Sequence, residues 1–86
     1  MNINQLILLV KSKIEKDILT QDIKIEDKTF LHKKHLSHQK GKFHLKINIF
    51  SKELTKMSKI KANKKVYSIL EFEIKEYIHS IQILIN

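Results

Sequence analysis

The sequence predicts an α+β domain with two layers, in which a three-stranded sheet carries all of its helices on one face. The chain has 86 residues, one glycine and no proline, so it is too short to divide its core and should form a single domain over residues 1–86. The spacing of apolar residues follows the order helix, strand, strand, helix, helix, strand. Each predicted strand has one isoleucine-rich face and one mainly polar face, so the helices should cover the same side of the sheet.

The first two elements are a helix and a strand. Apolar residues recur at helical spacing near the start of the chain, at Ile3, Leu6, Ile7, Val10, Ile14 and Ile18. This spacing predicts a helix over about residues 3–17, with Asn2 or Asn4 as its cap. From residue 21 to 27 every second residue is apolar, which predicts a strand with one face in water.

A polar, histidine-rich segment separates this strand from the next. We expect residues 28–40 to form a long loop, and Gly41 supplies the one conformationally permissive position near its end. Apolar side chains then alternate with polar ones over residues 43–49, which predicts a second half-buried strand. The two strands should form a hairpin.

Helical spacing returns after Ser51, through Leu54, Met57, Ile60, Val66, Ile69, Leu70, Ile74 and Ile78. Few apolar residues between Ser58 and Lys64 fit the helical spacing, so we expect a break there, with a short helix that leads into a longer one. The alternation over residues 80–85 predicts a final strand.

The predicted topology gathers histidines at one end of the sheet. If the last strand pairs beside the second, the helical connection between them makes the pair parallel. His44 lies at the start of the second strand and His79 just before the start of the third, so both should lie at the same end. The loop enters the sheet there, which makes His35 a predicted neighbour of His79.

Composition limits the classes of function. The net charge of +8 is compatible with binding to nucleic acid. All 17 basic residues are lysine, however, and arginine is the residue that contacts guanine and phosphate with a planar pair of donors. We therefore interpret the charge as a solvated lysine surface. No run approaches the roughly 18 apolar residues of a membrane span, and no secretory signal is visible, so we expect a soluble cytoplasmic protein.

The chain contains five histidines and no cysteine, so any soft-metal ligand of its own is an imidazole. For His38, solvation in a loop is the simpler interpretation, and for His44 a structural hydrogen bond competes with ligation. A self-contained zinc site built from His32, His35 and His79 is a further alternative. Two histidines alone leave a metal incompletely coordinated, which makes physical sense if a partner supplies the other ligands.

Four segments resemble motifs of the BolA-like protein family. Residues 25–35 resemble its D-x-S-x-x-H-x-x-H segment, and residues 43–51 resemble its T-H-F-x-x-x-I-V-S strand. Residues 66–67 and 73–83 resemble its V-Y and E-x-x-x-x-x-H-A-L-S-I motifs. The match runs without a gap from about Asp27 to Ile83.

This resemblance implies a class II KH-like fold and a non-enzymatic role as partner of a monothiol glutaredoxin in iron-sulfur cluster assembly or trafficking. It also implies a [2Fe-2S] cluster that bridges the two proteins, with cysteine and glutathione sulfur from the glutaredoxin side. By position, His79 matches the family's C-terminal histidine ligand and His35 matches the loop ligand of the histidine-bearing subgroup, with His32 as the alternative. We expect the isolated chain to be a monomer without a cluster.

The resemblance has departures, and it implies a second function class. The family's F-x-G and R-H-R motifs appear here as residues 54–56 and 62–64, without glycine, arginine or histidine. BolA-like proteins also include nucleic-acid-binding transcriptional regulators, which is the alternative function. KH domains clamp the nucleic-acid backbone with a G-x-x-G loop, and Gly41 is the chain's single glycine, so DNA binding should be weak and salt-sensitive.

Overall fold

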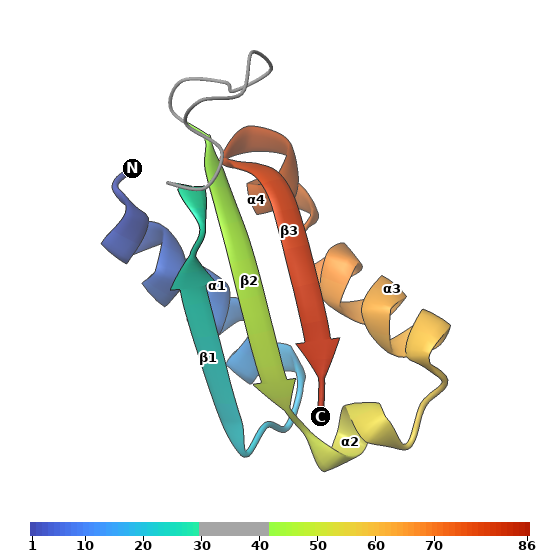
Figure 1. Ribbon diagram of the computed structural model, residues 1–86. Coiled ribbons are helices and arrows are strands. Elements are labelled where there is room, and N and C mark those ends of the chain that lie inside the picture. Colours follow the sequence, from blue (N-terminus) through green and yellow to red (C-terminus); the bar gives the residue numbers. More distant parts are fainter. Residues whose placement is uncertain (30–41) are drawn as a thin grey trace.

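Four helices and three strands make up the part of the chain that the computed structural model describes, residues 1–29 and 42–86 (Figure 1). In chain order they are α1 (Ile3–Asp17), β1 (Asp22–Asp27), β2 (Phe43–Phe50), α2 (Lys52–Thr55), α3 (Lys59–Ile69), α4 (Glu71–Glu76) and β3 (Ile78–Ile85). The predicted α+β class is confirmed. Among the described residues, none of the helices is both long and apolar enough to cross a bilayer.

The three strands form one mixed sheet in the order β1-β2-β3. β1 and β2 are antiparallel, and β2 and β3 are parallel, as the sequence predicted. Ile47 is at the centre of the sheet, because it pairs with Ile25 on one side and with Ile83 on the other. The parallel pair places the starts of β2 and β3 at the same end of the sheet.

The helices cover one face of the sheet, and none of the described helices lies on the opposite face (Figure 1). The fully or almost fully buried core combines alternate strand residues with helix residues: Leu6, Val10, Ile14, Ile18, Ile23, Leu45, Ile47, Ile49, Leu54, Ala62, Val66, Leu70 and Ile78. Period-two burial in β2 and helical spacing in α1 and α3 therefore meet in a single apolar layer.

The start of α1 follows from its first residues. The Asn2 side chain accepts a hydrogen bond from the Gln5 backbone N–H at 2.8 Å, and the Gln5 side chain accepts one from the Asn2 N–H at 3.0 Å. This reciprocal pair satisfies two amide donors that the first helical turn cannot. Of the two caps considered from the sequence, Asn2 is the one used.

The predicted boundaries after Ser51 need correction. The break between the short and the long helix lies at residues 56–58, ahead of the predicted range, because the Ser58 side chain accepts from the Lys61 N–H and caps α3. The longer helix is itself interrupted at Leu70, where the backbone leaves α geometry although its N–H still bonds the Val66 carbonyl at 3.1 Å. β3 begins at Ile78, a residue whose spacing continues the helical pattern of α4.

A partly buried ion pair connects α4 to α1. The Lys13 ammonium donates to both carboxylate oxygens of Glu73 at 2.8 Å, and the Glu73 side chain is 2% exposed. α4 leads directly into β3, and the Tyr77 carbonyl between them accepts from the Phe43 N–H at 2.9 Å. The ion pair thus supports the segment that delivers His79 to the sheet.

Candidate functional site

His44 and His79 meet at the sheet end where β2 and β3 begin. Their ring centroids are 4.9 Å apart with an interplanar angle of 25°, so the two imidazoles are stacked. The predicted meeting of these two histidines at one end of the sheet is confirmed. Its cause is the parallel β2–β3 pairing, which joins residues that are far apart in the chain.

His44 is a buried polar residue whose backbone and side chain both form hydrogen bonds. Its side chain is on the face of β2 that no helix covers, yet the residue is only 4% exposed. Its Nδ1 lies 2.7 Å from the Ser80 hydroxyl oxygen, its N–H donates to Thr29 Oγ1 at 3.1 Å and its carbonyl accepts from the Lys28 N–H at 2.7 Å. The hydrogen-bonding role considered from the sequence is therefore present, and Nδ1 is engaged in it.

His79 is exposed and is the extra residue of a bulge. Phe43 pairs with Ile78 and His44 pairs with Ser80, so one step along β2 corresponds to two steps along β3. A bulge changes the direction of the extra side chain and is common beside functional sites. His79 is thus an imidazole that a partner can reach, at a position where the sheet register alone does not orient it.

The other predicted site residues, His32 and His35, lie outside the described residues, as does His38. Within residues 1–29 and 42–86, no group of three or more His, Cys, Asp or Glu side chains is arranged to hold a metal ion. Of the two described histidines, His44 is buried and His79 is exposed.

A family model described as "BolA-like protein" matches residues 14–86. The chain belongs to the BolA-like protein family. The match covers the whole sheet and all helices except the first part of α1. None of the curated protein sequences compared with the chain matches it.

Two solved structures share the fold of this BolA-like chain. They are the BolA domain of SufE1 and BolA1, both from Arabidopsis thaliana, and each superposes with a TM-score of 0.76 at 23% sequence identity. Each alignment covers 92% of this chain and 87% of the other. At this identity the likeness establishes the architecture alone.

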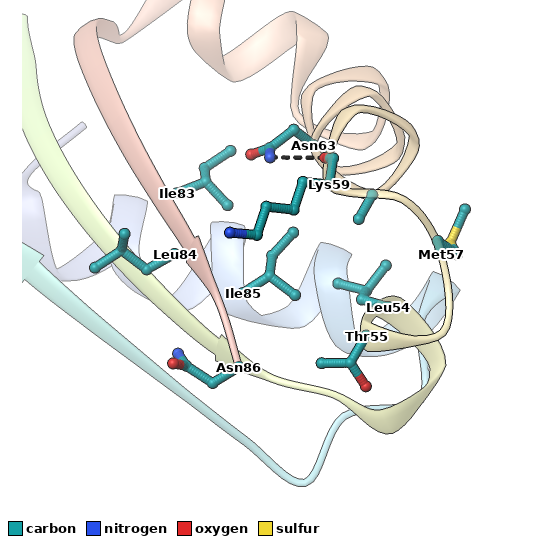
Figure 2. Close-up of a pocket in the computed structure, with 10 residues that line it drawn as sticks. Leu54, Thr55, Met57, Lys59, Asn63, Ile83, Leu84, Ile85 and Asn86 are labelled. Atoms are coloured by element: carbon teal, nitrogen blue, oxygen red, sulfur yellow. Dashed lines mark hydrogen bonds between the residues drawn. The ribbon is translucent and has the colours of Figure 1, made fainter.

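A hollow of about 460 Å³ in this BolA-like protein lies at the far end of β3 from His79 (Figure 2). Its walls are Leu54, Thr55, Met57, Lys59, Ala62, Asn63, Ile83, Leu84, Ile85 and Asn86. Residues 83–86 are consecutive and their side chains alternate between faces, so the hollow runs along the edge of the strand. It also borders the positions where the family's F-x-G and R-H-R motifs are replaced. Sequence reasoning marked these positions but did not predict the hollow.

A smaller hollow of about 280 Å³ adjoins His44. It is lined by Lys28, His44, Leu45, Lys46, Ser80, Ile81 and Gln82. Lys28 is 3.7 Å from the Glu26 carboxylate, so part of its charge is compensated. The lining nevertheless includes two ammonium groups, which favours an anionic ligand or an acidic partner surface.

Proposed function

We propose that this BolA-like protein is a non-enzymatic adaptor in iron-sulfur cluster assembly or trafficking. It binds a monothiol glutaredoxin and contributes His79, together with His35 or His32, to a bridging [2Fe-2S] cluster. The observation that carries the proposal is the exposed imidazole of His79 on a bulge at the end of the sheet where the 30–41 connection begins and ends. An incomplete set of imidazole ligands at that place suits a cluster shared with a second protein.

The length of chain after Thr29 allows both candidate loop ligands to reach this end of the sheet. The Thr29 hydroxyl accepts a hydrogen bond from the His44 backbone N–H, and the His44 ring stacks on that of His79. His32 follows Thr29 by three residues and His35 by six, which limits them to about 10 and 20 Å of extended chain. Either imidazole can therefore approach His79 without any change in the sheet.

The chemistry of the donors agrees with this role. The chain has no cysteine, so its ligands to iron would be neutral imidazoles, while the glutaredoxin and glutathione would supply thiolates. Histidine ligands on one iron of a two-iron cluster reduce its negative charge and raise its reduction potential. Lys28 and Lys46 add positive charge beside the same surface, which favours an anionic cluster and an acidic partner.

The first test is anaerobic reconstitution of the chain with a monothiol glutaredoxin, glutathione, iron and sulfide. We expect a heterocomplex whose visible spectrum differs from that of the glutaredoxin homodimer. His79→Ala and His35→Ala should change that spectrum, because each removes a ligand, and His38→Ala is the matched loop control that should hardly change it. His32→Ala identifies the loop ligand if His35→Ala is silent. An unaltered spectrum in His79→Ala contradicts the proposal.

A nucleic-acid-binding role is the second candidate, and the lysines of α2 and α3 are the observation that favours it. Lys52, Lys56, Lys59, Lys61, Lys64 and Lys65 gather over residues 52–65, with Glu53 as the single acidic residue. Lys59 also lines the hollow at the β3 edge. None of the residues that line this hollow is aromatic, so no side chain there can stack on a base and phosphate attraction would dominate any binding.

DNA affinity measured at two salt concentrations separates the two candidates. We expect weak binding without sequence preference that falls steeply with salt, since counterion release drives lysine-phosphate contacts. If Lys59 contacts phosphate, Lys59→Gln should reduce the slope of log affinity against log salt concentration by about one. Lys24→Gln on the edge strand β1 should leave that slope unchanged. A sequence preference that survives at physiological salt would instead favour the regulator.

A further inference from the structure

His44 touches both residues that form the bulge at the start of β3. Its ring stacks on His79, and its Nδ1 shares a hydrogen bond of 2.7 Å with the Ser80 hydroxyl. Ser80 is also the residue that pairs with His44 across the two strands. One buried side chain thus connects the exposed imidazole to the regular part of the sheet.

The two histidines differ in how firmly their surroundings hold them. His44 is buried, and both its N–H and its carbonyl are bonded to the Lys28–Thr29 segment. His79 is exposed and has no cross-strand partner in the register, so its side chain would otherwise exchange among staggered rotamers. Stacking on a fixed ring favours the rotamers of His79 that keep the rings parallel.

Such an arrangement matters for a ligand that must meet iron held by another protein. A preoriented ligand loses less conformational freedom on binding, and residues that orient metal ligands commonly change metal affinity about 10- to 100-fold when mutated. The Ser80 hydroxyl in turn fixes the plane of the His44 ring through Nδ1. Two residues, His44 and Ser80, therefore support the exposed imidazole of His79.

We propose that His44 and Ser80 are positioning residues that hold the His79 imidazole in the orientation in which it meets the cluster. This inference rests on the proposed function and deepens it, because it assigns His44 a role as a support for the ligand. It also explains why a polar ring is buried at the start of β2, on the face of the sheet that the helices leave uncovered.

The test uses Ser80→Ala, because Ser80 is exposed and its loss removes the hydrogen bond without cutting into the core. The first readout is the NMR signals of the His79 ring in the chain alone, which the ring current of His44 shifts. The second is the affinity of the chain for cluster-loaded glutaredoxin, followed by visible circular dichroism. We expect Ser80→Ala to move the ring signals toward those of an unstacked histidine and to weaken cluster-dependent binding about ten-fold.

Two further variants separate orientation from general damage. Ser80→Thr retains the hydroxyl on a residue suited to strands and should restore both readouts. Ser12→Ala removes an exposed hydroxyl from α1, away from the histidines, and should leave both unchanged. Ring signals that do not move in Ser80→Ala, or that move without loss of affinity, overturn the positioning role.

His44→Phe tests whether His44 is itself a ligand, since a phenyl ring can stack on His79 but cannot bind iron. We expect the cluster complex to form with the weakened affinity of Ser80→Ala. Complete loss of the complex, with otherwise native amide signals, would make His44 a ligand and overturn the inference. If the wild-type chain forms no cluster complex, the proposed function itself fails, whereas a normal wild type with an unaffected Ser80→Ala refutes the positioning role alone.

Discussion

Replacing Lys13 with methionine is expected to lower the free energy of unfolding by about 3 kcal/mol, the lower end of the range for breaking a buried ion pair. The Lys13 ammonium is 2.8 Å from both carboxylate oxygens of Glu73, whose side chain is only 2% exposed. Without the lysine, that carboxylate stays buried with no compensating cation. The lower end applies because the Lys13 side chain is 37% exposed, so water can partly replace it. Urea unfolding followed by circular dichroism measures the change.

Two other variants serve as controls for the loss of stability in Lys13→Met. Lys65→Met breaks the exposed pair of Lys65 and Glu53 at 3.2 Å and should cost less than about 1 kcal/mol. The double variant Lys13→Met with Glu73→Leu should recover most of the stability, because an apolar pair of similar volume needs no compensation. Equal losses in Lys13→Met and Lys65→Met would show that the pair between α1 and α4 does not support the fold.

Leu70→Ala is expected to destabilise the protein by about 2–5 kcal/mol. Leu70 is 0% exposed and occupies the junction where α3 ends and α4 begins. Truncating it removes buried methyl groups and leaves a cavity that the interrupted helix cannot close. The variant should show a lower urea midpoint with an unchanged slope.

Ile60→Ala is the matched control for Leu70→Ala. Ile60 is an aliphatic residue of α3 but is 69% exposed, so its truncation should change the stability by no more than about 0.5 kcal/mol. A loss in Leu70→Ala as small as that in Ile60→Ala would mean that the junction is not a packed part of the core.

Much of the fold was predictable because it depends on local patterns. Period-two alternation placed β1 and β2 to within one residue, since a strand that buries one face must repeat every second residue. The helical spacing of α1 and the asparagine before it placed that helix correctly. The meeting of His44 and His79 followed from the order of elements, because a helical crossover makes β2 and β3 parallel.

Other features could not be predicted from the spacing of apolar residues. Ile78 continues the spacing of α4, and its assignment to β3 depends on pairing with Phe43 across the sheet. The bulge at His79 arises from that pairing, and so does the contact between Ser80 and His44. The ion pair of Lys13 and Glu73 joins residues 60 positions apart, and nothing in the sequence near either residue indicates its partner.

The period of the apolar side chains was sufficient to place α1, β1, β2 and the buried face of the sheet, because burial against a single layer imposes that period on the chain itself. The orientation of the candidate ligand was established only when the packed strands came together. Its causes are a one-residue mismatch between β2 and β3, a hydroxyl that meets a ring nitrogen and two imidazoles that stack. Each of these is a relation between distant residues, and such relations exist only once the chain has folded.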